Sequence, residues 1–221
     1  FIFLSSVKVY GPSESKKIDE ETICKPNDPY GISKHLAENY LRKIQASDFR
    51  VAIVRSPVVY GPGVKGRVLK LIRLLDTPLP LPFKNIKSEF GSVYVGNLVQ
   101  LINQIIVKKE SGVFLAGDKD PKTFYDFLSL LRYFLNRRKR LFHMPLFILR
   151  LITLFNQNFS NILTNPIVID NTKTNKILNF TSIRIPFSKE ILNTRDSYHD
   201  LAPSRLAEGI LELFVNFFFK H

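Results

Sequence analysis

The chain has 221 residues, a formal net charge of +13 and an apolar content of 45%, which allows one large domain or a domain and a half with a sizeable core. A single cysteine, Cys24, excludes a disulfide framework, and the four histidines show no metal-ligand spacing, so no metal site is expected. No apolar run is long enough to span a membrane, and the positive charge favours an anionic partner such as a sugar nucleotide or a membrane surface rather than nucleic acid, for which no motif is present.

The first predicted element is a buried strand over residues 1–4, which ends at Ser5 and Ser6. A polar loop over residues 12–28 follows, interrupted by prolines. A helix is then predicted to begin at Pro29, because proline suits a first helical turn and Asn27 or Asp28 can cap it. Apolar residues at helical spacing continue this helix to about residue 44.

Tyr30 and Lys34 lie four residues apart in this helix, so both should be on one face. The positive end of the helix dipole and the lysine charge both favour an ionised phenol. A phenolate held in this way can accept the proton of an alcohol. Alone, the Tyr-x-x-x-Lys spacing is also common in helices that have no catalytic role.

Further elements follow the helix at intervals typical of an α/β protein. A buried strand at residues 50–55 leads into the turn Tyr60-Gly61-Pro62-Gly63. Later segments alternate between the two types: helices at residues 64–75, 97–108 and 123–136, strands at 92–95, 113–117 and 167–169, and a proline-rich connector at 78–82.

A basic, largely apolar region extends from residue 127 to 169 and contains no acidic residue. The run Arg137–Arg140 lies beside the apolar segment 141–155, and the basic residues of the region are Arg132, Arg137, Arg138, Lys139, Arg140 and Arg150. Two interpretations remain open, namely a packed helix with a solvated basic flank, or a membrane-surface face that meets a lipid-linked sugar. Residues 203–220 could form an amphipathic helix, and the origin of the tail 200–221 also stays open.

The ordered set of Ser-Ser-x-x-x-Tyr-Gly, Tyr-x-x-x-Lys and Tyr-Gly-Pro-Gly resembles the extended short-chain dehydrogenase/reductase family, in its NAD-dependent sugar epimerase/dehydratase branch. The resemblance covers residues 1 to about 200. It implies an α/β fold: the C-terminal part of a doubly wound parallel Rossmann sheet plus a smaller, mostly helical substrate-binding subdomain. The implied NAD-binding part is residues 1–62 and 92–117, and the implied substrate part is 63–91 and 118–199.

The glycine-rich phosphate turn of such folds does not precede the Ser-Ser segment in these 221 residues. In the family that turn precedes the Ser-Ser segment, so we expect an N-terminally truncated chain that begins in mid-sheet. We also expect the 221 residues alone to be inactive.

The resemblance implies NAD as cofactor and assigns roles to individual residues. Tyr30 would be the base, Lys34 would support it and bind the nicotinamide ribose, and Ser6 would hold the reacting hydroxyl, with Ser5 as the neighbouring alternative. Pro57 and Val58 match the segment that backs the nicotinamide. The cofactor-binding set is therefore Tyr30, Lys34, Ser5, Pro57 and Val58.

Val7 and Lys8 stand where dehydratases of the family often carry Asp-Glu, which argues against dehydration. The segments around residues 60–65, 78–82 and 94–99 are similar to bacterial surface-polysaccharide epimerases, some of which act on N-acetylhexosamines carried on undecaprenyl diphosphate. Phe90 stands where the family often has a diphosphate-binding Arg, and Lys65, Lys84 or Lys87 could substitute for it.

The predicted function is thus NAD-dependent epimerisation at C4 of a nucleotide-linked or undecaprenyl-diphosphate-linked sugar through a 4-keto intermediate. The alternatives are a nucleotide-sugar dehydratase or reductase, or an inactive truncated remnant. The resemblance also implies a homodimer formed through the Tyr-x-x-x-Lys helix. A cytoplasmic location is expected, either free or in contact with the cytoplasmic face of the membrane.

Overall fold

The computed structural model describes residues 1–12, 17–61, 63, 68–69, 71–72, 75, 84, 89–119, 122–134 and 168–180. The chain divides into two compact units. The first contains residues 1–60, 91–121 and 167–184, and the second contains residues 61–90, 122–166 and 185–221. Each unit is described separately below.

The first unit is built on a three-stranded parallel sheet in the order β1-β3-β7, formed by β1 (Ile2–Ser6), β3 (Ala52–Ser56) and β7 (Gly112–Leu115). All three strands lie within two residues of their predicted positions. In the pairing of β1 with β3, Ser5 is opposite Arg55 and Ser6 is opposite Ser56. Because the strands are parallel, their carboxyl ends meet at one edge of the sheet.

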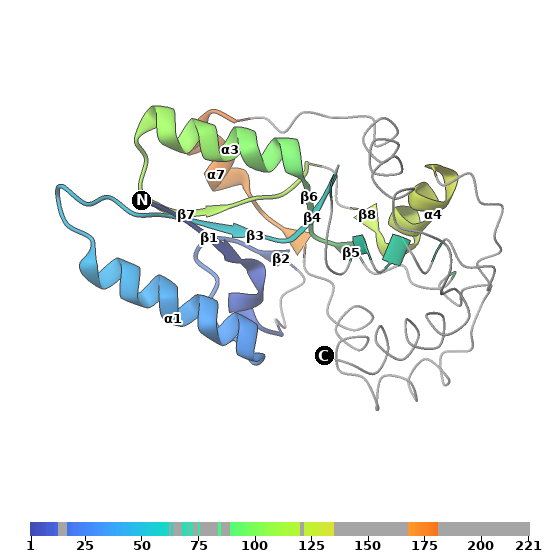
Figure 1. The fold of residues 1–221 in the computed structure, drawn as a ribbon, viewed down its shortest axis with the longest axis horizontal. Helices are drawn as coiled ribbons and strands as arrows, with labels where there is room; N and C mark the ends of the chain where they lie inside the picture. Colours follow the sequence, from blue (N-terminus) through green and yellow to red (C-terminus); the bar gives the residue numbers. More distant parts are fainter. Residues whose placement is uncertain are drawn as a thin grey trace. The chain divides into compact units, whose positions relative to one another are not determined.

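Helices cover both faces of this sheet (Figure 1). On one face lies α1 (Pro29–Ile44), and on the other lie α3 (Val95–Lys108) and α7 (Thr172–Leu178). The predicted start of α1 is confirmed, since Asp28 accepts a 3.0 Å hydrogen bond from the Gly31 N–H and Pro29 occupies the first turn.

The larger apolar core lies between the sheet and α3. Its buried members alternate along the strands, because alternate side chains point to the α3 face of the sheet, and they recur at helical spacing in the amphipathic α3. They are Ala52, Val54, Val93, Leu98, Leu101, Ile105, Phe114, Ala116, Leu178 and Phe180. A smaller cluster contains Val7, Val9, Tyr10, Ile18 and Leu115.

Several short elements of the first unit were not predicted. A 3₁₀ helix, η1 (Val7–Tyr10), follows β1, and β2 (Lys17–Ile18) lies inside the segment expected to be a loop. Strand β2 pairs in parallel with β9 (Val168–Ile169), and β4 (Val58–Tyr60) pairs in parallel with β6 (Ser92–Tyr94). Residues 167–184, which include β9, belong to the first unit, whereas the sequence analysis expected them in the substrate part.

The second unit contains β5 (Glu89–Phe90), which pairs antiparallel with β8 (Lys122–Thr123), and α4 (Phe124–Phe134). Thr123 caps α4, because its Oγ1 accepts a 3.1 Å hydrogen bond from the Asp126 N–H. In the predicted helix 64–75, four apolar residues at helical spacing are buried: Val68, Leu71, Ile72 and Leu75.

Other predictions lie outside the described residues, namely the 78–82 connector, most of the basic region 127–169 and the 203–220 helix. Within the described part of the chain, no helix combines the length and the apolar character that crossing a membrane would require.

Candidate active site

The candidate site lies where β1 ends and α1 begins. Ser6 is the last residue of β1, and its Oγ accepts a 3.3 Å hydrogen bond from the Lys8 N–H at the start of η1. In parallel α/β sheets, ligands bind at the carboxyl ends of the strands. Ser6 and its neighbour in register, Ser56, both occupy that edge.

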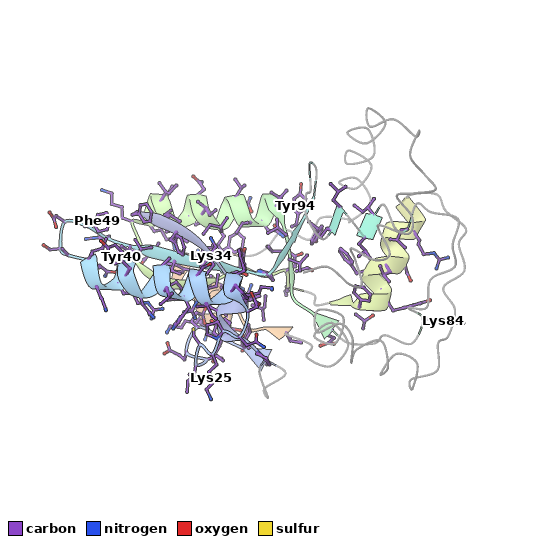
Figure 2. The ribbon with its side chains drawn as sticks, turned by 60° about the horizontal axis from the view of Figure 1, so that its bottom comes forward. Lys25, Lys34, Tyr40, Phe49, Lys84 and Tyr94 are labelled. Carbon is purple, nitrogen blue, oxygen red and sulfur yellow. The ribbon has the colours of Figure 1, made fainter. Side chains whose placement is uncertain are left out.

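Tyr30 and Lys34 lie one turn apart on α1, as their spacing predicted. The Lys34 Nζ lies 5.8 Å from the centre of the Tyr30 ring and 4.8 Å from the centre of the Phe3 ring. It donates a 3.0 Å hydrogen bond to the carbonyl oxygen of Leu4, which ties the side chain to β1 (Figure 2). The Tyr30 side chain is 50% exposed, so a ligand can reach it.

A second ammonium group lies beside Tyr30. The Lys8 Nζ is also 5.8 Å from the ring centre, and it forms a 2.8 Å ion pair with Asp28. Partial burial opposes ionisation of Asp28, but hydrogen bonds from Lys8 and from the Gly31 N–H hold its pKa below the ordinary value. Asp28 therefore has two roles: it caps α1, and it balances the charge of Lys8.

The two serines at the end of β1 differ in their surroundings. Ser5 is buried, and its Oγ donates a 2.6 Å hydrogen bond to Glu38 of α1. Ser6 is only partly buried and its hydroxyl accepts a bond from backbone alone. The geometry favours Ser6 over Ser5 as the hydroxyl that meets a substrate, because the Ser5 hydroxyl is already committed inside the protein.

A buried charged network between α1 and β3 lies next to this site. The sequence analysis did not predict it. Arg55 of β3 donates two hydrogen bonds to Glu38, from Nε to Oε1 at 3.1 Å and from Nη2 to Oε2 at 2.6 Å. Arg55 Nη1 donates to the Tyr10 hydroxyl at 2.8 Å, and Tyr10 donates to the Asp19 carbonyl at 2.7 Å. The signal in the sequence was that Glu38 continues the 30, 34, 38 spacing along one face of α1.

Burial affects the ionisation of this network. Burial raises the pKa of Tyr10 to about 12, although the neighbouring Arg55 guanidinium acts in the opposite direction. Burial alone would lower the pKa of Arg55, but the hydrogen bonds to Glu38 outweigh it and raise the pKa above its ordinary value. Arg55 thus remains a cation and Tyr10 a neutral hydrogen-bond donor.

The other predicted site residues lie at the end of β3 or in the second unit. Pro57 and Val58 follow β3 at the carboxyl edge of the sheet, and Val58 is 36% exposed. Lys84 is exposed in the second unit, whereas Lys65 and Lys87 lie outside the described residues. In the described ranges, no three His, Cys, Asp or Glu side chains gather as a metal site would need.

Comparison with known proteins decides the family. The sequence profile of the NAD dependent epimerase/dehydratase family matches residues 1–117, just over half of the chain. The chain belongs to this family. A curated relative, UDP-glucose 4-epimerase of Vibrio cholerae, is 40% identical over 124 residues, which are 53% of this chain and 38% of the relative. The chain thus spans well under two thirds of that relative.

Solved structures of the family share the fold. UDP-glucuronic acid 4-epimerase from Bacillus cereus in complex with NAD superposes with a TM-score of 0.69 at 19% identity, covering 94% of this chain and 61% of that one. UDP-N-acetylglucosamine 4-epimerase from Bacillus cereus gives 0.64 at 17% identity, with 89% and 64% covered. dTDP-glucose 4,6-dehydratase from Bacillus anthracis in complex with NAD gives 0.64 at 19% identity, with 90% and 61% covered.

NAD is the cofactor of this family. The described residues fit the nicotinamide end of such a cofactor, because Tyr30 is open to a ligand and Lys34 is fixed beside it at the carboxyl edge of the sheet. The sequence has one Gly-x-Gly-x-x-Gly match, at residues 61–66, but it follows β4 and not a strand of the β1-β3-β7 sheet, so it does not have the position of a pyrophosphate turn.

Proposed function

We propose that the protein catalyses NAD-dependent epimerisation at C4 of a nucleotide-linked or undecaprenyl-diphosphate-linked sugar, with an N-acetylhexosamine as the preferred sugar. The proposal rests on one arrangement above all. Tyr30 is accessible, Lys34 is tied to β1 within 5.8 Å of the phenol ring, and Ser6 ends the same strand.

In the proposed mechanism, Tyr30 takes the proton of the C4 hydroxyl. The Lys34 ammonium stabilises the negative charge on the phenol oxygen, and the Ser6 hydroxyl orients the reacting oxygen by hydrogen bonding. NAD, held by residues of this site, would supply the redox chemistry by taking up the C4 hydride and giving it back, so that a 4-keto sugar is the intermediate. Tyr30 then returns the proton, so the sugar leaves with C4 inverted and no net redox change.

The cofactor would be held by Lys34, Tyr30 and the segment Pro57–Val58, with Ser5 contributing only through its backbone because its hydroxyl is occupied by Glu38. For the substrate diphosphate, Lys84 is the exposed lysine that could supply a positive charge, as the resemblance suggested. The net charge of +13 is consistent with an anionic substrate.

Epimerisation is favoured over dehydration by the residues that follow Ser6. Val7 is buried and Lys8 is a cation paired with Asp28, so neither position supplies the carboxylic acid that elimination of water needs. Dehydration is the second candidate, because the fold is equally that of dTDP-glucose 4,6-dehydratase.

We further propose that the protein forms a homodimer through α1. Four large apolar side chains recur every four residues along this helix and are all exposed: Ile32, Leu36, Tyr40 and Ile44. Figure 2 shows Tyr40 projecting from α1. A contiguous apolar stripe of this kind is typical of a surface that packs against a partner.

The test is a product assay on the protein expressed from its whole reading frame, with NAD and, in separate reactions, UDP-GlcNAc, UDP-glucose and undecaprenyl-diphospho-GlcNAc. We expect the C4 epimer, identified by proton NMR, with no net formation of NADH. A 4-keto-6-deoxy product would replace the proposal with dehydration, and absence of any product from all three sugars would reject both.

The alternative of an inactive remnant is tested by titrating NAD into the 221-residue chain and into the product of the whole reading frame. We expect the 221 residues to bind NAD with a Kd well above about 1 μM, because no Gly-x-Gly-x-x-Gly turn directly follows a strand of the β1-β3-β7 sheet. Tighter binding by the 221 residues would contradict this expectation.

A further inference from the structure

Helix α1 carries the candidate catalytic pair, and the side chain that it buries most deeply is a charged one. Two residues of α1 are buried, Gly31 and Glu38. Neither apolar cluster that the described residues form in the first unit includes a residue of α1. An apolar stripe usually holds a helix on a sheet, so a buried glycine and a buried glutamate on α1 are unusual points of attachment.

The first attachment is a close approach at the start of the helix. A β-carbon at Gly31 would lie 2.6 Å from the carbonyl oxygen of Lys8, so α1 and η1 touch backbone to backbone. The second attachment is Glu38, two turns further on, whose carboxylate is 0% exposed. Lys34 lies between the two.

The Glu38 attachment reaches both strands beneath the helix. Its Oε1 accepts hydrogen bonds from Ser5 of β1 at 2.6 Å and from Arg55 of β3 at 3.1 Å, and its Oε2 accepts from Arg55 at 2.6 Å. Ser5 and Arg55 are opposite each other in the β1–β3 register, so one carboxylate joins two neighbouring strands to the helix. Ser5 is also the residue next to Ser6.

We propose that the Glu38–Arg55 pair is a positioning device, which sets the rotation and axial register of α1 so that Tyr30 and Lys34 face Ser6. The inference rests on the proposed function. Residues 30, 34 and 38 share one helical face, and a slip of one residue would turn that face by about 100°. A bidentate carboxylate–guanidinium pair resists such a slip because its geometry is directional, whereas apolar contacts tolerate sliding.

The pair therefore acts through the helix and touches no substrate. Glu38 lies one helical turn beyond Lys34, and its partner Ser5 lies one residue before Ser6. The pair is therefore adjacent to the proposed catalytic residues but is not one of them. Losing the pair should loosen the Tyr30–Lys34–Ser6 arrangement while the sheet, whose core lies on the other face, remains in place.

The test uses three variants of the protein expressed from its whole reading frame. Arg55→Lys keeps the charge but loses the bidentate fork. The double variant Glu38→Met/Arg55→Met removes both charges and keeps an apolar filling, a replacement that often preserves stability. Leu101→Ala, in the core under α3, is the control that lowers stability away from α1.

We expect Arg55→Lys and the double variant to lower kcat at least tenfold with less than a threefold change in KM, at temperatures well below their melting temperatures. Leu101→Ala should keep kcat within about twofold even where its melting temperature is the lowest of the three. If the double variant retains its kcat, or if kcat simply follows melting temperature across all three, the pair is only structural and the proposal is wrong.

A readout that does not need activity separates this inference from the proposed reaction. In protein labelled with ¹³C on the tyrosine rings, the Tyr30 signal is assigned from its loss in Tyr30→Phe. We expect Arg55→Lys to shift or broaden that signal, and Leu101→Ala to leave it unchanged. If the parent protein is inactive on every sugar, the proposed function is wrong. If the Tyr30 signal is unshifted in Arg55→Lys, the positioning role is wrong, whatever the activity.

Discussion

Gly31 of α1 and Lys8 of η1 approach so closely that a β-carbon on Gly31 would lie 2.6 Å from the Lys8 carbonyl oxygen. A glycine in a helix normally weakens it, by about 1 kcal/mol relative to alanine. Here the missing side chain allows the first turn of α1, with Tyr30 in it, to lie directly on the segment that follows Ser6.

The first prediction is that Gly31→Ala destabilises the protein although it improves helix propensity. Overpacking against backbone costs about 1–3 kcal/mol, which outweighs the propensity gain of about 1 kcal/mol. Chemical denaturation should show a lower free energy of unfolding for Gly31→Ala, whereas Lys43→Ala at an exposed position of α1 should be neutral or slightly stabilising. A stabilised Gly31→Ala variant would contradict the close contact.

The second prediction concerns the proposed base. Tyr30→Phe should lower kcat by about 100- to 10,000-fold in the protein expressed from its whole reading frame, because only the proton-accepting oxygen is lost. Its melting temperature should match that of the parent, since the ring is half exposed. Turnover close to that of the parent would remove Tyr30 from the chemistry.

The third prediction is a pH dependence of stability at Asp170. Hydrogen bonds from Lys17 and Thr172 lower the pKa of Asp170 from 3.8 to about 2. A carboxylate with a lowered pKa contributes stability above its unfolded-state pKa, and loses that contribution as the pH falls through its folded-state pKa. Asp170 directly follows β9 and forms a 2.7 Å ion pair with Lys17 of β2, so this pair links the two paired strands.

Asp170→Asn should therefore be less stable than the parent at neutral pH, by less than about 1 kcal/mol because the Lys17 partner is largely exposed. The difference should shrink between about pH 4 and pH 2 and vanish below that range. Lys17→Met should reproduce much of the loss. A difference that is the same at every pH, followed by circular dichroism in denaturant, would show that the ionised carboxylate has no part in it.

The fourth prediction tests the proposed dimer. Leu36→Lys, in the middle of the exposed stripe of α1, should convert dimers to monomers in sedimentation equilibrium, because burying an unpaired ammonium is unfavourable. Val107→Lys is the matched control, since Val107 is 67% exposed on α3 and belongs to another surface. If both variants sediment like the parent, α1 is not the contact.

The features that the sequence predicted correctly depend on interactions between residues that are close together in the chain. The strand at the start, the cap and proline of α1, and the common face of Tyr30 and Lys34 depend on contacts within about four residues, so they were predicted correctly. The helices α3 and α4 were recognised for the same reason, apart from their ends.

The tertiary structure alone decided the features that join distant segments. Strand β2 has two residues and exists because β9, about 150 positions later, pairs with it, so no local pattern could predict either its presence or the transfer of residues 167–184 to the first unit. The Glu38–Arg55 pair is the same case in the site. A glutamate in a helix and an arginine in a strand look like ordinary surface charges until the packing of α1 on the sheet brings them together, because burial and ion pairing are properties of the folded packing.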